Sequence, residues 1–331
     1  MKKTFHIPVF VPHKGCPHDC VFCNQKKITG QTEEMTPKKA KEIIDSHLET
    51  IEKRNKREEC HIEIAFFGGS FTAIERESMI SLLEVAHKYV KEKRADGIRC
   101  STRPDCISPE ILSICKKYGM TSVELGVQSA DEEVLCLSNR GHSFEDVKNA
   151  SKLIKEYEME LGLQMMTGLP GDSFEISKMT AEKIASLLPD CVRIYPTLVM
   201  EGTHLFEMYE KGEYSPQKLD DAVNLASELA SFFKDRNITV LRIGLQTTDG
   251  VNRETVKGPY HEAFAELVYS KMMRDEIEKA YLLWKRDNNS NLRVFEYKTL
   301  PQKVSQAIGH RGENKKYFKE KYGVDLKIVT N

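Results

Sequence analysis

The chain has 331 residues, a net charge of −1 and 40% hydrophobic residues. This length suits one large domain, or a large and a small one, around a sizeable core. The apolar stretch near the start is too short for a secretion signal or a membrane-spanning helix, so we expect a cytoplasmic protein with no membrane partner. An odd number of cysteines, nine, in a reducing compartment favours metal or cluster ligation over disulfides.

Short apolar runs alternate with longer amphipathic stretches along the first 235 residues. The runs predict strands at 5–11, 62–67, 98–102, 122–127, 161–167 and 191–196, and the stretches predict helices at 37–56, 75–93, 109–118, 143–157, 174–188 and 216–235. Thr36 before Pro37 and Ser108 before Pro109 are expected to cap helices. Six strand–helix units predict an α/β fold with a parallel sheet, as a full or partial (β/α)6 barrel of the TIM type. An open, doubly wound sheet is the alternative.

The pattern changes after Gly244. A helical stretch covers 260–285, a polar break follows at 287–291, and a short strand–helix–helix–strand unit completes the chain. We therefore divide the chain into a core at 1–245, a helical extension at 246–286 that packs on the core, and a small α/β unit at 287–331. Residues 285–331 carry a net charge of +6, so that the remainder is −7. This asymmetry predicts a polyanionic partner near the C-terminal unit, although a solvated basic helix face has the same composition.

Three cysteines follow the first predicted strand within GCPHDCVFCNQ. Cys16, Cys20 and Cys23 have the spacing Cys-x3-Cys-x2-Cys. Three thiolates on one loop can bind three irons of a [4Fe–4S] cluster and leave the fourth iron open to a substrate or cofactor. A structural zinc site is the alternative, with His13 or His18 as a fourth ligand. The other six cysteines lack close spacing and are interpreted as small buried hydrophobic residues.

This arrangement resembles the radical S-adenosylmethionine (SAM) superfamily, and the resemblance covers about residues 5–245. It implies two cofactors, a [4Fe–4S] cluster and S-adenosyl-L-methionine, and an electron donor such as flavodoxin or ferredoxin. In this family the reduced cluster cleaves SAM, and the resulting 5′-deoxyadenosyl radical removes a hydrogen atom from the substrate. The protein positions the cofactor and excludes water.

The resemblance also implies which residues contact the cofactor near the methionyl group. Gly68, Gly69 and Ser70 in FFGGS match backbone groups that bind the methionyl amine, although many members carry Glu at the third position. Arg140 in NRGHS matches an arginine that binds the cofactor carboxylate, a role suited to a guanidinium. Phe22, between two cluster cysteines, is expected to pack on the adenine or to shield the cluster.

The remaining implied contacts follow later strands, where barrel enzymes build their sites. Ser101 in STRPD and Gln164 in LQMMTGLPG match positions that contact the ribose, and some relatives carry Asp at the second of these. Gln128 in ELGVQS matches a cofactor-contacting glutamine. No catalytic residue is evident beyond the cluster ligands, and Tyr195 in RIYPTL is only a weak candidate. For each residue taken alone, a surface or capping role is an equal alternative.

Longer strings resemble the Elongator catalytic-subunit branch and its shorter bacterial relatives: STRPDCI, ELGVQS, NRGHS, GLPG, RIYPTLVMEGTHLFEMYEKGEYSP and GPYHEAFAELV. That branch modifies wobble uridine, which implies tRNA or another RNA as substrate and partner. The Elongator subunit has a longer gap between its first two cluster cysteines and a C-terminal acetyltransferase domain, which we do not expect here, so no acetyl-CoA is expected. Short relatives are often named coproporphyrinogen-oxidase-like, which makes porphyrin decarboxylation the alternative reaction.

The C-terminal string AIGHRGENKKYFKEKYGVDLKIV resembles the core of a KH domain. In that fold a Gly-x-x-Gly loop between two helices binds single-stranded nucleic acid, and lysines meet its phosphates. The alternatives are a small basic cap over the barrel, or an RNA-binding protein in which a metal is only structural. The nucleic-acid contacts implied are Gly309, His310, Arg311, Gly312, Lys315, Lys316 and Lys319.

Overall fold

Seven parallel strands form the main sheet of the computed structural model, which describes residues 2–11, 16, 18–24, 34–245, 256–287 and 293–330. Their spatial order, β1-β2-β3-β4-β5-β6-β8, follows the chain, and each neighbouring pair is parallel. A doubly wound sheet reverses its strand order part-way, so that alternative is wrong and the partial barrel is confirmed. The strands are β1 (Lys3–Val11), β2 (Cys60–Gly68), β3 (Gly97–Thr102), β4 (Met120–Gln128), β5 (Glu160–Thr167), β6 (Cys191–Pro196) and β8 (Thr239–Ile243).

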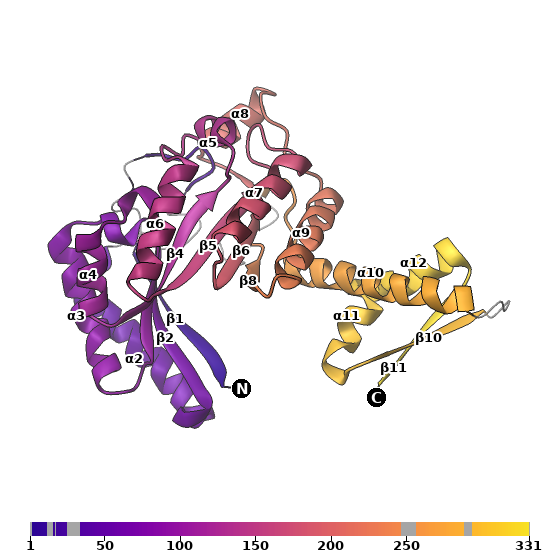
Figure 1. Cartoon of the computed structure of the whole chain (residues 1–331), viewed down its shortest axis with the longest axis horizontal. Helices are drawn as coiled ribbons and strands as arrows, with labels where there is room; N and C mark the ends of the chain where they lie inside the picture. The colour runs from indigo at the N-terminus through magenta and orange to yellow at the C-terminus, as the bar shows by residue number, and fades with distance from the viewer. Residues whose placement is uncertain are drawn as a thin grey trace.

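The main helices connect the strands and cover one face of the sheet (Figure 1). Thr36 accepts a hydrogen bond from the Lys39 amide and Ser108 accepts one from the Ile111 amide, so both predicted caps are confirmed. The short α5 and α8 and the strand β8 were not predicted. The helices are α2 (Pro37–Arg54), α3 (Arg76–Lys91), α4 (Pro109–Lys117), α5 (Glu132–Leu137), α6 (Phe144–Glu156), α7 (Phe174–Ser186), α8 (His204–Glu210) and α9 (Leu219–Lys234).

The two faces of the sheet have opposite character because successive side chains of a strand point to opposite faces. Apolar residues such as Ile64, Val123 and Ile194 are fully buried against the helices. The opposite face, which we call the inner face, carries charged residues that alternate along the strands with these apolar ones. Arg99 and Glu124 are two of them. The core therefore lies between sheet and helices, and the inner face is left for polar chemistry.

The C-terminal unit stands to one side of the core, joined to it by helix α10 (Phe264–Asp287) (Figure 1). Phe264 and Val268 pack in the main core, whereas Ile277 and Tyr281 pack in a second, aromatic core. Because α10 contributes to both cores, the boundaries at 246 and 287 stay predictions. The predicted order strand, helix, helix, strand is confirmed. The elements are β10 (Val294–Thr299), α11 (Val304–Ile308), α12 (Glu313–Tyr322) and β11 (Asp325–Thr330), and the two strands pair in parallel.

A further antiparallel pair, β7 (Val199–Met200) with β9 (Val256–Lys257), connects the segment after β6 to the segment before α10. Across the ranges that the structure describes, no helix combines the length and the apolar character needed to cross a membrane.

Candidate active site

The cysteine loop is held by backbone hydrogen bonds to segments that follow two distant strands. The Val21 amide donates to the Ser138 carbonyl after β4, at 3.1 Å, and the Leu205 amide after β6 donates to the Val21 carbonyl at 2.8 Å. Cys20 is buried, whereas Cys16 and Cys23 are partly exposed. These contacts place the three thiols at the carboxyl edge of the sheet, where parallel α/β folds bind ligands.

Arg140 lies directly against the cysteine loop. Its Nη1 donates to the Cys20 Sγ at 3.3 Å and its Nη2 donates to the Gly126 carbonyl at 2.7 Å, in a side chain that is 7% exposed. A guanidinium in this position would offset the negative charge of a metal-bound thiolate. Its Nε is buried and has no partner within the described residues. The predicted contact with a cofactor carboxylate stays a prediction, because two of the three nitrogens already serve the protein.

Two glycines allow the chain to approach closely at this edge. Gly68 has a φ of +117°, and a Cβ there would lie 2.7 Å from the Val11 carbonyl oxygen. A Cβ on Gly126 would lie 2.7 Å from the Arg140 Nη2, so any larger residue would displace that guanidinium. The Gly69 amide donates to the same Val11 carbonyl at 3.1 Å. Glycine is therefore required at position 68 by geometry, independently of the predicted contact of Gly68 with a cofactor amine.

Ser70 is buried and its hydroxyl is already engaged. The hydroxyl lies 2.7 Å from the Thr102 hydroxyl and accepts a hydrogen bond from the Arg103 amide at 3.1 Å. Burial raises the pKa of the nearby Cys16 thiol, an effect opposed by the Ser70 amide, Arg140 and Arg103. The Ser70 side chain thus joins the ends of β2 and β3, its carbonyl accepts a hydrogen bond from the Ala73 amide at 3.0 Å, and its predicted cofactor contact stays a prediction.

Four other predicted residues lie on the inner face or beside it. Gln128 has a φ of +66° at a bulge in β4, and its Oε1 accepts a hydrogen bond from the Gln164 Nε2 at 3.0 Å. Ser101 shares a face of β3 with Arg99, two residues away. On β6 the Tyr195 hydroxyl lies 3.4 Å from the Arg193 Nη1. The structure therefore brings the two glutamines together, whereas their contacts with a cofactor stay predictions.

Phe22 packs between two small apolar clusters. One contains Val134, Met166 and Leu169, and the other contains Val199 and Leu205. This ring is partly buried in the two clusters, and its predicted role, packing on the adenine or shielding the cluster, stays a prediction.

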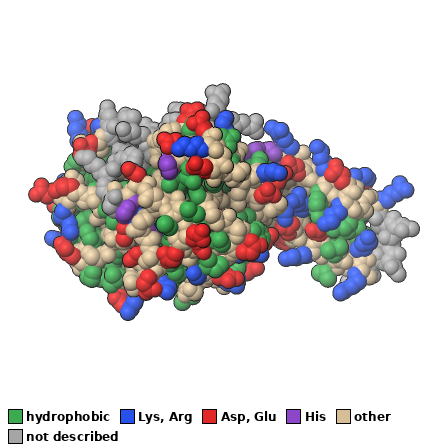
Figure 2. Space-filling view, turned by 90° about the horizontal axis from the view of Figure 1, so that it is seen from above, with side chains coloured by type: hydrophobic (Ala, Val, Ile, Leu, Met, Phe, Trp, Pro, Cys, Tyr) green, Lys and Arg blue, Asp and Glu red, His purple; other side chains and the backbone are tan. Residues whose placement is uncertain are grey.

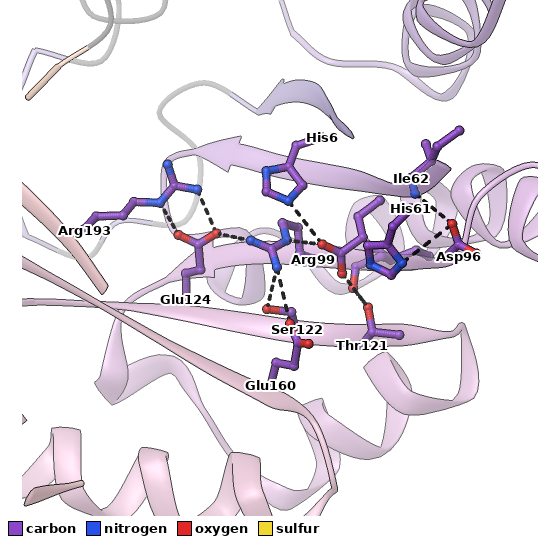
Figure 3. A network of polar contacts seen from close by, with 12 residues as sticks. His6, His61, Ile62, Asp96, Arg99, Thr121, Ser122, Glu124, Glu160 and Arg193 are labelled. Carbon is purple, nitrogen blue, oxygen red and sulfur yellow. Dashed lines mark hydrogen bonds and ion pairs between the residues drawn. The ribbon is translucent and has the colours of Figure 1, made fainter. Parts of the chain in front are cut away.

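A chain of buried ion pairs crosses the inner face, and the sequence analysis did not identify it. Arg99 donates to Glu63 at 2.8 Å and to Glu124 at 3.0 Å, and Arg193 binds Glu124 through two nitrogens (Figure 3). Glu63, Arg99 and Glu124 are each less than 5% exposed. The sequence does contain a sign of these ion pairs, because each of four otherwise apolar strands carries a charged residue. Which of these charged residues pair with one another depends on the register of the strands.

The pKa of Glu63 gives a testable pH dependence. Burial opposes its ionisation, but the His6 hydrogen bond and the Arg99 charge lower its pKa from 4.5 to about 2. A depressed carboxyl pKa stabilises the fold above pH 4.5, and that stabilisation is lost as the pH falls toward 2. The difference in free energy of unfolding between wild type and Glu63→Gln should therefore narrow by about 2 kcal/mol between pH 6 and pH 3. Urea unfolding at several pH values measures it, and a constant difference would contradict the assignment.

Two family models match the sequence of this chain. The model described as radical SAM superfamily covers residues 10–184, and the model of the radical SAM C-terminal domain covers residues 189–274. The first match extends over more than half of the chain.

The chain belongs to the radical SAM superfamily. The resemblance found from the cysteine triplet is therefore confirmed, and with it the enzyme class. Membership implies a [4Fe–4S] cluster and SAM as the cofactors of the family.

Curated relatives and one solved structure connect this radical SAM chain to the Elongator branch. A tRNA uridine(34) acetyltransferase of Methanocaldococcus infernus is 31% identical over 302 residues, which is 80% of this chain and 56% of the relative. Human Elongator complex protein 3 is 30% identical over 188 residues, which is 51% of this chain and 34% of the human protein. The solved structure of M. infernus Elp3 with an N-terminal deletion has a TM-score of 0.67 at 27% identity, and the match covers 83% of this chain and 64% of the solved chain. The chain spans about half the length of the full-length archaeal relative.

The donor set fits a cluster better than a zinc ion. Within the part of the chain that the structure describes, no three Cys, His, Asp or Glu side chains converge as ligands of a single metal ion would. His18 packs over Gly141, where a Cβ would lie 2.4 Å from its ring, and His13 lies outside the described residues. A cubane binds its thiolates at separate corners, and the Arg140 guanidinium offsets thiolate charge. Membership in the radical SAM superfamily therefore favours the cluster over the zinc alternative.

The Gly-x-x-Gly loop joins α11 to α12. Gly309 and Gly312 have φ values of +82° and +79°, and a Cβ on Gly309 would lie 2.8 Å from the Asn314 amide. The buried Asn314 side chain donates to the carbonyls of Ser270 and Gln306, each at 3.0 Å. This side chain fixes the loop to both α10 and α11, a role that the sequence analysis did not foresee.

The predicted nucleic-acid contacts are not equally available. Arg311, Lys315 and Lys316, which we call the exposed trio, lie at the surface; Lys319 is exposed as well but forms an ion pair with Asp325 at 2.8 Å. His310 is partly buried, with its ring 5.3 Å from that of His261. Figure 2 shows Lys and Arg side chains spread over the C-terminal unit and His side chains at its junction with the core. The exposed trio thus carries the positive charge of the loop.

Proposed function

We propose that this chain is a radical SAM enzyme that modifies a nucleoside of tRNA or another RNA. The observation that carries the proposal is the cysteine loop with Arg140 against Cys20, on a fold similar to that of an archaeal Elp3. Relatives named for tRNA uridine(34) modification and a basic C-terminal unit favour RNA over a small substrate. Flavodoxin or ferredoxin would serve as the electron donor.

The proposal gives the residues of the site distinct tasks. Cys16, Cys20 and Cys23 would hold the cluster, and Arg140 would offset their negative charge. Bound together, the cluster and SAM supply a 5′-deoxyadenosyl radical that removes a hydrogen atom from the substrate. Phe22 would exclude water from the loop.

The inner face would orient the rest of the cofactor and the substrate. The hydrogen bond from Gln164 to Gln128 holds both amides at the carboxyl ends of neighbouring strands. Amides present both donors and acceptors, which suits ribose hydroxyls and base edges. Ser101 would extend this polar surface on β3. The backbone of Gly68, Gly69 and Ser70 would meet the methionyl amine.

We expect the exposed trio at the Gly-x-x-Gly loop to carry most of the RNA affinity of the C-terminal unit. Replacing Arg311, Lys315 and Lys316 with alanine should weaken tRNA binding about tenfold or more and reduce the salt dependence of binding. The slope of log K against log salt should fall by about 2 to 3, since each lost phosphate contact contributes about 0.7 to 0.9. Fluorescence anisotropy at several salt concentrations measures both quantities.

The matched control replaces Lys285 at the end of α10 and Lys298 and Lys327 in the C-terminal unit with alanine, which removes the same charge outside the Gly-x-x-Gly loop. This control should lose little affinity. Equal losses in the two triple variants would show that net charge alone attracts the RNA and that the loop has no specific part.

The decisive test of the function uses total tRNA from a strain that lacks the protein. Protein reconstituted anaerobically with iron, sulfide and SAM, and reduced by dithionite, should generate a nucleoside that mass spectrometry finds in wild-type tRNA and not in the deletion strain. An unchanged nucleoside profile, together with turnover of coproporphyrinogen by the same sample, would replace the proposal with the porphyrin reaction.

A further inference from the structure

Arg103 is a fully buried guanidinium at the end of β3, less than 2% exposed within the STRPD string. Its Nε and Nη2 each donate to a carboxylate oxygen of Asp105 at 2.9 Å, while its backbone amide donates to Ser70. Its Nη1 is buried and has no partner among the residues that the structure describes. Burying a cation is costly unless opposite charge lies nearby, and Asp105 is itself 23% exposed on its side chain.

The groups that surround this cation include two of the three predicted cluster ligands. The Arg103 charge acts on the Cys16 thiol and interacts with Cys20 and Cys106. The geometry supports this placement: the Arg103 amide donates to the Ser70 hydroxyl at 3.1 Å, and the Ser70 amide in turn forms a hydrogen bond with Cys16, while Arg140 donates directly to Cys20 at 3.3 Å.

His142 in the loop before α6 and Asp146 in its first turn add two more titratable groups to this neighbourhood. Burial, then Arg140 and Arg103, lower the pKa of His142 to about 4, so this imidazole is neutral at physiological pH. Asp146 also experiences the Arg103 charge, but its carboxylate is bound by the Ser143 amide and hydroxyl. Asp105 is therefore the carboxylate that pairs directly with Arg103, and neutral His142 adds no positive charge beside it.

We infer that Arg103 is a positioning residue that makes the cluster easier to reduce, and that Asp105 partly opposes this effect. The inference rests on the proposed function, because it requires a cluster on the three cysteines. Reduction transfers one electron from a flavodoxin-type donor to the cluster and adds one negative charge there, with no bond formed or broken. A fixed cation in a site of low dielectric stabilises that charge, and a fixed carboxylate destabilises it.

Two substitutions in the same pair should therefore act in opposite directions. Arg103→Met should lower the ratio of reduced to oxidised cluster about tenfold at a fixed solution potential, which is about 59 mV for a one-electron couple. Asp105→Asn should raise that ratio. The readout is a redox titration of the reconstituted, SAM-free protein, followed by electron paramagnetic resonance. Arg76→Gln is the control, because it removes an equal charge from an exposed pair with Glu110, and it should leave the ratio unchanged.

The opposite signs separate an electrostatic role from a structural one. If the Arg103–Asp105 pair only shaped the loop, both variants would shift the potential in the same direction, and that result would overturn the inference. Should Arg103→Met fail to bind iron, Asp105→Asn and the charge-preserving Arg103→Lys decide the matter: the first should raise the ratio and the second should keep it within about threefold of wild type. Absence of a cluster from the wild-type protein would defeat the proposed function itself, whereas a wild-type cluster with unshifted variants would defeat only this inference.

Discussion

The Cys20→Ser protein is expected to emerge from anaerobic reconstitution with almost no bound iron and to form no 5′-deoxyadenosine from SAM. The serine hydroxyl is a poor ligand for iron, so only two of the three cysteine thiolates would remain to hold the cluster. Cys20 is also the buried cysteine of the loop that accepts the Arg140 hydrogen bond, and a serine hydroxyl there can accept that bond but not replace the thiolate as an iron ligand. Iron analysis and chromatography of the reaction products measure the two losses.

The matched control is Cys136→Ser, which removes an exposed thiol outside the cysteine loop. That protein should retain its iron and its SAM cleavage. If Cys20→Ser kept a full complement of iron, the three-cysteine assignment would be wrong, and equal iron loss in the control would point to general damage by substitution of cysteine.

A second large effect is expected from Arg99→Met at the centre of the inner-face ion pairs. The substitution removes the cation between Glu63 and Glu124 and leaves two carboxylates without that partner inside the protein (Figure 3). Breaking a buried pair in this way typically costs about 3–5 kcal/mol of folding free energy. Chemical denaturation followed by circular dichroism should show that loss as a lower midpoint.

Arg94→Met provides the comparison, because Arg94 pairs with Glu52 where both side chains are at least one third exposed. An exposed pair contributes about 0–1 kcal/mol, so this variant should stay near wild-type stability. Similar losses in the two variants would mean that burial of the Arg99 network adds nothing. Glu63→Gln combined with Arg99→Met should recover part of the stability, since it removes one of the stranded charges.

The fold was accessible from sequence wherever local signals agree with the long-range packing. Alternating apolar strands and amphipathic helices predicted the parallel sheet, and Thr36 before Pro37 predicted a helix start that the structure confirms. Strand β8 was not predicted although residues 238–243, ITVLRI, include an apolar run; in the structure it lies at the end of the sheet, and its residues from Thr239 to Arg242 are at least partly exposed. The helices α5 and α8 are too short, at six and seven residues, to show a helical period.

The candidate site likewise contains features that are local in the sequence and features that depend on long-range packing. The cysteine spacing is a local pattern, so it could be read directly from the chain. The Arg103–Asp105 pair is also local, but its burial beside the cysteine loop depends on how β1 and β3 are placed in the sheet. Lys319 shows another long-range effect: the fold brings Asp325 to within 2.8 Å of it, which the sequence did not indicate, and its contact with phosphate stays a prediction.

Electron paramagnetic resonance of the dithionite-reduced protein, recorded with and without SAM, tests the open coordination site most directly. We predict a [4Fe–4S]⁺ signal that requires Cys16, Cys20 and Cys23 and that changes its g values when SAM is added, because the cofactor binds the iron without a protein ligand. A signal that SAM leaves untouched, or the lack of any cluster signal in fully reconstituted protein, would contradict the account.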